Sequence, residues 1–256
     1  MLAIERRNQI LALLQKDSRV VVGDLAKVFR VTEETIRRDL EKLEKQGFAK
    51  KAYGGAIINE SFHVDLPYTV RQKTNVQNKQ EIAELVCGLV QDGDHIMLDA
   101  SSTAVYIAKH LKDKKNLTII TNSIEILIEL SNVSGWKIFS TGGVMKEGSL
   151  SLVGYQAEKM ISSFHVDKTI ISCKGIDIQK GITDSNEMEA YIKKLMLDSA
   201  NMKILAADNT KFDKVSFARI DELSGINLII TDLEPDIRWM NALEQTNIES
   251  YYKDRR

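Results

Sequence analysis

The sequence predicts an α/β protein with a small N-terminal domain and a larger, doubly wound domain built around a mostly parallel sheet. Three observations lead to this prediction. Residues 1–58 read as three helices and a short hairpin, and residues 78–256 alternate apolar strand-like runs with helix-like segments. Residues 59–77 between them are polar, aperiodic and contain one of the two prolines, which indicates a linker.

The composition is that of a folded protein with a sizeable core. The chain has 256 residues, of which 43% are hydrophobic, and no apolar run reaches the roughly 18 residues that a membrane span needs. The N-terminus is polar and charged from Glu5 onward, unlike a secretory signal peptide. Cys87 and Cys173 have no paired spacing, which indicates a reducing compartment. We therefore expect a cytoplasmic protein.

The formal net charge is −1, but the charge is unevenly distributed. Residues 1–58 hold 12 Lys and Arg against 8 Asp and Glu, whereas the remaining residues hold 23 against 28. A basic N-terminal part on an acidic body is expected when one part of a chain binds a polyanion.

Helical periodicity defines the elements of the N-terminal part. Helices are predicted over Ala3–Gln15 and Asp24–Phe29, separated by a short β-branched run at residues 20–22. Thr32 is the predicted N-cap of a third helix that ends at Gly47. The core face of this third helix follows from apolar residues at helical spacing, namely Ile36, Leu40 and Leu43.

Two adjacent arginines, Arg37 and Arg38, lie away from that apolar face. Fixed positive charges at this place suit a phosphate backbone or a guanine edge. A solvated helix laced with salt bridges is the alternative interpretation, because the pairs Glu34–Arg38 and Glu41–Lys45 have i,i+4 spacing.

The segment from Phe48 to Ile58 reads as a hairpin that carries Lys50 and Lys51. Together with the preceding helices, it matches a winged helix-turn-helix, in which one helix enters the major groove and the wing contacts the backbone. We expect base contacts from the third helix and backbone contacts from the hairpin. The expected DNA-binding residues are Thr32, Glu33, Glu34, Thr35, Arg37 and Arg38 on the helix, and Lys50, Lys51 and Tyr53 on the hairpin.

These residues also carry a family resemblance. Arg6-x3-Ile10-x3-Leu14, followed after 17 residues by Thr32-x2-Thr35-Ile36-Arg37-Arg38-Asp39-Leu40, resembles the signature of the DeoR family of bacterial transcriptional regulators. Leu43-Glu44 and Tyr53-Gly54-Gly55-Ala56 are similar to the family's continuation through the wing. The resemblance covers residues 3–58 and implies a helix-turn-helix over about Val20–Asp39.

Hydroxyl-bearing side chains follow three successive strand-like runs of the larger domain. They stand in Asp99-Ala100-Ser101-Ser102-Thr103, in Thr121-Asn122-Ser123 and in Ser140-Thr141-Gly142-Gly143. Ligands of parallel sheets bind at the carboxyl ends of strands, and hydroxyls at a helix N-terminus suit a phosphate. Plain N-capping is the alternative for the first segment, but three such segments together predict an anion pocket.

Further segments resemble the effector domain of the DeoR family, whose fold is similar to ribose-5-phosphate isomerase and CoA-transferase subunits. They are Ser172-Cys173-Lys174-Gly175, Gly181-Ile182-Thr183, Glu187/Glu189 and Asp208-x2-Lys211-Phe212. This resemblance, over about Lys79–Asp232, implies a sensor of a phosphorylated sugar or a related metabolite. By position, the pocket would be lined by Asp99, Ser101, Ser102, Thr103, Thr121, Asn122, Gly142, Gly143, Lys174, Gly175, Asp208 and Lys211.

Two departures from the family pattern concern this pocket. Ser101-Ser102-Thr103 replaces the usual Gly-Thr-Thr and adds a side chain where backbone should approach the ligand, which implies a smaller or shifted effector. Ser172-Cys173 stands near a usual Gly-Ala and would place a thiol and Lys174 at the pocket rim. Lys174 either neutralises a phosphate or is an exposed lysine at a strand end.

An isomerase-like enzyme with an accessory DNA-binding domain is the second interpretation, with Glu187 or Glu189 as a base or simply on a helix surface. The paired aspartates of the related isomerases are absent where Ser172-Cys173-Lys174 stands, so we expect no catalysis. The histidines, at positions 63, 95, 110 and 165, lack metal-ligand spacing, and we expect neither a metal site nor a cofactor. A module whose basic helix docks on another protein is a third interpretation.

The sequence thus predicts a transcriptional regulator, and the resemblance implies a repressor of a carbohydrate-metabolism operon. Its partners would be double-stranded operator DNA at residues 1–58 and a phosphorylated sugar or related effector at residues 78–256. A homodimer or homotetramer would present DNA-binding domains to adjacent half-sites. We expect no membrane partner.

Overall fold

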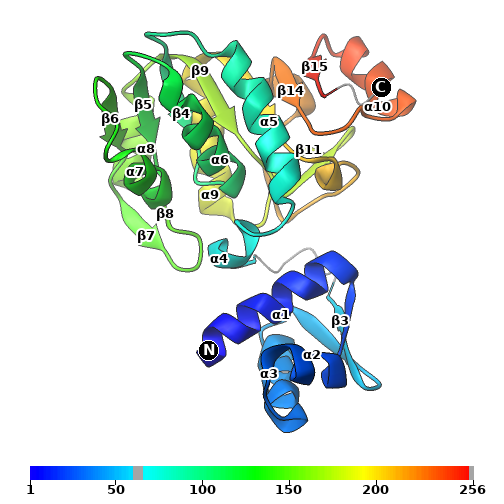
Figure 1. Ribbon diagram of the computed structural model, residues 1–256. Helices are drawn as coiled ribbons and strands as arrows, with labels where there is room; N and C mark the ends of the chain where they lie inside the picture. The colour runs from blue at the N-terminus through cyan, green and yellow to red at the C-terminus, as the bar shows by residue number, and fades with distance from the viewer. Residues whose placement is uncertain (60–65, 254–256) are drawn as a thin grey trace. The chain divides into compact units, whose positions relative to one another are not determined.

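The computed structural model describes residues 1–59 and 66–253, and the chain divides into two compact units, Met1–Thr74 and Asn75–Arg256 (Figure 1). Each unit has its own arrangement of helices and strands.

The N-terminal unit is a winged helix-turn-helix. Its sheet has the order β1-β3-β2, with antiparallel pairs, and the hairpin of β2 and β3 is the predicted wing. The predicted helices and hairpin are confirmed. The β-branched run after the first helix contributes to β1, which completes the three-stranded sheet. The elements are α1 (Ala3–Asp17), β1 (Arg19–Val21), α2 (Val22–Phe29), α3 (Glu33–Lys45), β2 (Ala49–Ala52) and β3 (Gly55–Ile58).

A buried ion pair joins α1 to α3. Arg6 Nε lies 2.5 Å from Asp39 Oδ2, and Arg7 Nη1 lies 3.4 Å from Asp39 Oδ1. Arg6 and Asp39 are only 8% and 3% exposed, beside an apolar core that includes Ile10 and Leu40. Because a buried charge is stable only with its partner, this pair fixes the position of α3 on the domain.

Part of the expected linker belongs to the N-terminal unit. The short helix α4 (Tyr68–Arg71) lies within residues 59–77, and Val70 packs into the core of the winged helix. Thr69 Oγ1 accepts a hydrogen bond of 3.1 Å from Asn8 Nδ2 on α1. These contacts, which polar composition does not reveal, explain why the unit runs to Thr74. Residues 60–65 lie outside the described residues.

The C-terminal unit is built on a seven-stranded parallel sheet, which confirms the doubly wound α/β prediction. Its order is β15-β14-β12-β9-β4-β5-β6. The chain runs outward from β4 to β6, returns to β9 beside β4, and then runs outward in the opposite direction. The strands are β4 (His95–Leu98), β5 (Thr118–Thr121), β6 (Lys137–Ser140), β9 (Val166–Ile171), β12 (Ala200–Ala206), β14 (Leu228–Ile230) and β15 (Glu249–Tyr251).

Helices cover both faces of this sheet (Figure 1). One set is α5 (Val76–Leu89), α6 (Ser102–His110) and α7 (Ile124–Leu130), which pack side by side. The other set shares one apolar core with the sheet and consists of α8 (Tyr155–Ser162), α9 (Glu187–Asp198) and α10 (Ile237–Gln245).

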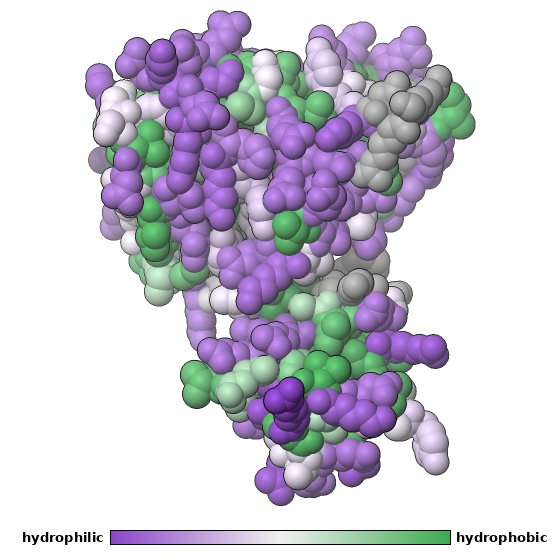
Figure 2. Space-filling model, in the orientation of Figure 1, coloured by the Kyte–Doolittle hydropathy of each residue, from purple (hydrophilic) through white to green (hydrophobic). Residues whose placement is uncertain are grey.

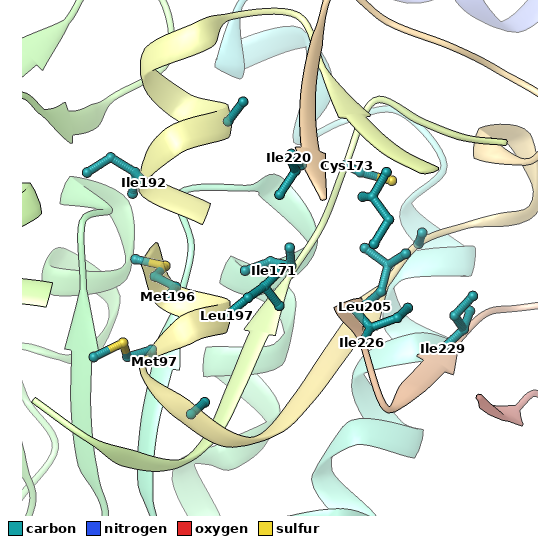
Figure 3. Close-up of a cluster of buried hydrophobic side chains, with 14 of the residues drawn as sticks. Met97, Ile171, Cys173, Ile192, Met196, Leu197, Leu205, Ile220, Ile226 and Ile229 are labelled. Atoms are coloured by element: carbon teal, nitrogen blue, oxygen red, sulfur yellow. The ribbon is translucent and has the colours of Figure 1, made fainter. Parts of the chain in front are cut away.

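The core beneath α9 is closely packed. Figure 3 shows Met196 and Leu197 of α9 near Met97 of β4 and Ile171 of β9, and all four side chains are almost fully buried. The drawn face of this unit in Figure 2 is mainly hydrophilic, with small separate apolar patches. Apolar burial between helices and sheet therefore organises the domain.

Several short elements were not predicted, because segments of three or four residues carry little periodic signal. They are the hairpin of β7 (Val144–Lys146) and β8 (Ser151–Val153), a small antiparallel sheet of β10 (Gly175–Asp177), β11 (Gly181–Asp184) and β13 (Ala218–Asp221), and the 3₁₀ turns η1 (Leu111–Asp113), η2 (Asn209–Lys211) and η3 (Leu223–Gly225). Helix α10 and strand β15 were also missed. Among the described residues, no helix has the length and apolarity that crossing a membrane requires.

The buried ion pair leads to a stability prediction. Asp39→Asn leaves the Arg6 guanidinium buried without an anion, and we expect the opening free energy of the N-terminal unit to fall by about 3–5 kcal/mol. Amide hydrogen exchange in α1 and α3 of the full chain measures this. The control Asp17→Asn changes an exposed carboxylate and should alter the value by less than about 0.5 kcal/mol. Equal protection in the two variants would contradict the role of the pair.

Candidate functional site

The N-terminus of α3 is built as predicted. Thr32 is the N-cap, and its hydroxyl accepts a hydrogen bond of 3.2 Å from the Thr35 backbone N–H. The buried face of the helix consists of Ile36, Asp39, Leu40 and Leu43. Since these residues face the core, Arg37 and Arg38 are exposed on the opposite side, at the part of a recognition helix that contacts base edges.

Both exposed arginines have acidic partners one turn earlier. Arg37 Nη2 lies 2.7 Å from Glu33 Oε2, and Arg38 Nε lies 3.2 Å from Glu34 Oε1. The second pair was predicted, and the first was not. All four side chains are at least half exposed, so each pair is weak and can be exchanged for another partner.

The wing is braced against α3 by Lys51. Its Nζ lies 3.0 Å from Glu41 Oε1 and 3.6 Å from Glu44 Oε2. The hydrogen bond and charge of Lys51 lower the pKa of Glu41. Glu41 thus contacts Lys51, not Lys45 as predicted, because Lys51 points to the same face of β2 as the buried Ala49.

Two predicted contact residues stay accessible on the wing. Lys50 points to the other face of β2 and is exposed, and Tyr53 is fully exposed at the hairpin turn. The wing therefore presents one cation and one aromatic ring beyond the braced Lys51.

The sheet of the C-terminal unit reverses its winding direction between β4 and β9. In doubly wound folds, ligands bind in the crevice outside the carboxyl ends of such a strand pair. The predicted segments 99–103 and 172–175 directly follow these two strands. The topology thus brings part of the predicted effector set to the expected place.

Two hydroxyls at the start of α6 are available to a ligand. Ser101 Oγ caps the helix by accepting a bond of 3.0 Å from the Ala104 backbone N–H. Ser102 and Thr103 are 5% and 4% exposed, and within residues 1–59 and 66–253 their hydroxyls have no hydrogen-bond partner. A nearly buried hydroxyl without a partner at a helix N-terminus is suited to an anionic oxygen.

A buried ion cluster adjoins the start of α6. Asp99 Oδ1 accepts bonds from the backbone N–H and the hydroxyl of Ser101, at 3.2 and 2.6 Å. Asp99 Oδ2 accepts one of 3.0 Å from the Ser172 backbone N–H and lies 3.3 Å from Lys193 Nζ. Lys193 also contacts Asp184. Both oxygens of Asp99 are thus engaged inside the protein.

The cluster keeps its charges. Burial alone would lower the pKa of Lys193, but the carboxylates of Asp184 and Asp99 raise it above its usual value. Burial alone would raise the pKa of Asp184, but Lys193 and Lys174 lower it. Lys193 and Asp184 were not predicted as site residues. A charged residue within the buried stripe of α9 was the signal that could have revealed Lys193.

Other predicted lining residues have internal contacts. Thr121 Oγ1 donates to the Leu98 carbonyl at 2.7 Å and accepts from the Ser123 N–H at 3.1 Å. A Cβ on Gly143 would lie 2.5 Å from the Val153 carbonyl oxygen, and one on Gly175 would lie 2.3 Å from that of Lys214. These two glycines are thus needed where chain segments cross. Gly142 borders open space, with no atom within 4 Å of an added Cβ.

Asn122 and Cys173 are buried. Asn122 Nδ2 donates to the Leu152 carbonyl at 3.1 Å, and its buried Oδ1 has no partner in the described part of the chain. Cys173 is 5% exposed within the apolar core of Figure 3, and burial raises the pKa of its thiol to about 12. The expectation of a thiol at the pocket rim is therefore wrong, whereas Lys174 is half-buried.

The strands that carry the predicted lining residues are spread across the sheet. Asp208 and Lys211 follow β12, and Gly142 follows β6, four strands away. With neighbouring strands about 4.8 Å apart, this is roughly 19 Å, longer than a sugar phosphate. Lys211 and Asp208 both lie near Cys173 after β9, because the charge of each acts on the pKa of its thiol. Asp208 Oδ1 also accepts a hydrogen bond of 3.0 Å from the Thr210 backbone N–H.

The two glutamates considered as a catalytic base lie in different environments. Glu187 is exposed, whereas Glu189 is 8% exposed and is not a surface residue. Its Oε1 accepts a hydrogen bond of 2.8 Å from Ser151, and its Oε2 lies 3.6 Å from Lys146 Nζ. Glu189 thus anchors the β7–β8 hairpin to α9.

Comparison with known proteins agrees with this arrangement. The family model of the DeoR-like helix-turn-helix domain matches residues 6–62, and that of the DeoR C terminal sensor domain matches residues 74–233. The HTH-type transcriptional regulator YulB of Bacillus subtilis is 42% identical over 249 residues, covering 97% of this chain and 96% of the relative. The HTH-type transcriptional repressor GlcR of the same species is 35% identical over 245 residues, with 96% and 94% covered.

Other relatives and solved structures are similar at lower identity. The L-fucose operon activator of Haemophilus influenzae is 33% identical over 227 residues, covering 89% of this chain and 91% of the relative. Ribose 5-phosphate isomerase A of Methanocaldococcus jannaschii resembles 54% of this chain and 55% of its own, with a TM-score of 0.40 and 16% identity. With family models matching both domains and relatives aligned over nearly its whole length, the chain belongs to the DeoR family of transcriptional regulators.

Proposed function

We propose that this regulator represses a carbohydrate-metabolism operon and that a phosphorylated sugar or related metabolite controls its affinity for operator DNA. The observation that carries the proposal is a pair of hydroxyls, those of Ser102 and Thr103, that have no partner among the described residues and lie where the sheet reverses its winding direction. Phosphate oxygens are strong acceptors for hydroxyls and for the amides of a helix N-terminus.

We assign the positive charge of this site to two lysines that follow neighbouring strands of the sheet. Lys174 follows β9 and Lys211 follows β12, and both are half-buried. A phosphate over α6 would receive hydrogen bonds from Ser102 and Thr103 and favourable charge from the lysines. Since Asp99 is engaged with Lys193, we assign it the role of holding the ion cluster, and not of contacting the effector.

The named relatives support control of a sugar operon. GlcR is a transcriptional repressor, another relative is a putative aga operon transcriptional repressor of Escherichia coli, and a third is an L-fucose operon activator. Repression is the sign that we propose. An effector that binds the free protein better than the DNA-bound one would release the operator.

The DNA contacts that we propose follow from the exposed face of α3 and the wing. Arg37 and Arg38 contact bases, with Thr32, Glu33, Glu34 and Thr35 beside them, and Lys50 and Tyr53 contact the backbone. Lys51 positions the wing through Glu41 and reaches DNA only if that pair opens. A cytoplasmic homodimer or homotetramer would place these elements on adjacent half-sites.

The base contact of Arg37 is testable. Arg37→Ala should weaken binding to a duplex enriched by the wild-type protein from a randomised pool by about 1–3 kcal/mol, roughly five- to 150-fold. Fluorescence anisotropy measures the affinity, and circular dichroism checks the fold. Arg219→Ala, which removes an exposed arginine of the C-terminal unit, is the matched control and should bind like wild type. Unchanged affinity of Arg37→Ala would remove it from the interface.

The effector site is testable by thermal shift. At least one member of a panel of phosphorylated sugars should raise the Tm, because a ligand that binds the native state stabilises it. Its unphosphorylated counterpart should not. The variant Ser102→Ala/Thr103→Val should lose roughly 1.5–3 kcal/mol of binding per hydroxyl that contacts the charged phosphate.

Ser163→Ala is the control, since its exposed hydroxyl donates to the Met160 carbonyl at the end of α8, at 2.7 Å. No Tm shift with any phosphorylated sugar would contradict this class of effector. A full shift in the double variant would instead place the effector elsewhere.

A further inference from the structure

Three cations on the exposed face of α3 and the wing, Arg37, Arg38 and Lys51, have anionic partners in the protein. Glu33 holds Arg37, Glu34 holds Arg38, and Lys51 lies between two glutamates. Helix α3 as a whole carries five acidic and four basic residues, although its domain has excess positive charge. The recognition helix is therefore not a simple basic surface.

We propose that Glu33 and Glu34 act as a selectivity filter. They disfavour DNA complexes in which the arginines find new partners but the glutamates do not. The inference rests on DNA binding by α3 and extends it to a role for the acidic half of each pair. Each arginine must leave its glutamate, or share it, to contact DNA. The carboxylate that it leaves then needs a hydrogen-bond donor.

Non-specific binding does not supply that donor. It rests on contacts of Lys and Arg with phosphates and on the release of counterions. If Arg37 turned from Glu33 to a phosphate, the carboxylate would remain unpaired beside another anion. Because like charges repel, Glu33 and Glu34 make this kind of complex less favourable.

Base edges in the major groove can satisfy both halves of a pair. Guanine O6 and N7 accept a bidentate bond from arginine, and the cytosine N4 amino group donates to a glutamate. On a DNA sequence with these groups in the right positions, each internal ion pair is replaced by two new contacts, one of the arginine and one of the glutamate. Arg38 and Glu34 are 74% and 62% exposed, so the exchange needs little rearrangement of the domain.

The variant Glu33→Gln/Glu34→Gln tests this role. It keeps side-chain size and removes both charges. Two probes are needed: a duplex enriched by the wild-type protein from a randomised pool, and a scrambled duplex of the same composition. We expect affinity for the scrambled duplex to rise by about three- to tenfold, with a smaller rise or a fall for the enriched duplex.

The salt dependence gives a second readout. If the freed arginines contact phosphates, the slope of log K against log salt for the scrambled duplex should steepen by up to about two. The double variant Glu5→Gln/Asp17→Asn is the matched control, because it removes two carboxylates from α1. It should change both affinities by the same factor and leave their ratio intact.

The ratio of the two affinities decides the outcome. The filter is supported if the ratio of affinity for the enriched duplex to affinity for the scrambled duplex falls at least about threefold in the Glu33→Gln/Glu34→Gln protein and does not fall in the control. An unchanged ratio, or equal falls in both double variants, overturns it, because general charge then explains the effect. Loss of preference already in the wild-type protein would instead contradict sequence-specific DNA binding itself.

Discussion

The C-terminal domain depends most on the ion pairs and the hydrogen bond of the Lys193 ammonium group. This group lies among Asp99, which follows β4, Asp184 at the end of β11, and the Ser172 carbonyl after β9, which accepts its hydrogen bond at 2.8 Å. Each buried charge would be strongly unfavourable without the others. The same group therefore joins the two strands between which the sheet reverses, and it sets the position of Ser102 at the start of α6.

Ion pairs of two kinds have different roles in the DNA-binding domain. The buried pair of Arg6 and Asp39 fixes where α3 lies, because neither charge can be left alone inside the protein. The exposed pairs of Arg37 and Arg38 contribute little to the stability of the domain, and they can be replaced by contacts with DNA. Burial thus separates the arginine that positions the helix from the two that we propose to read the groove.

The main elements were predictable because they carry long periodic or apolar signals, such as the face of Ile36, Leu40 and Leu43 that α3 buries. The contacts of side chains at strand ends were not predictable. The sequence does not reveal that the Thr121 hydroxyl bonds a neighbouring strand, or that the Thr103 hydroxyl has no partner in the described structure. Nor does it bring Asp184 to Lys193, since that contact depends on how β11 packs against α9.

In the proposed mechanism, effector binding at the start of α6 and operator binding at α3 are thermodynamically coupled. The most direct test measures both affinities, each with and without the other ligand, using a sugar phosphate that raises the Tm and the enriched duplex. Linkage requires that the two ligands change each other's Kd by the same factor, typically about five- to 150-fold. We predict that the sugar phosphate raises the Kd for DNA and that DNA raises the Kd for the sugar phosphate equally. Two affinities that are independent of each other would contradict the account.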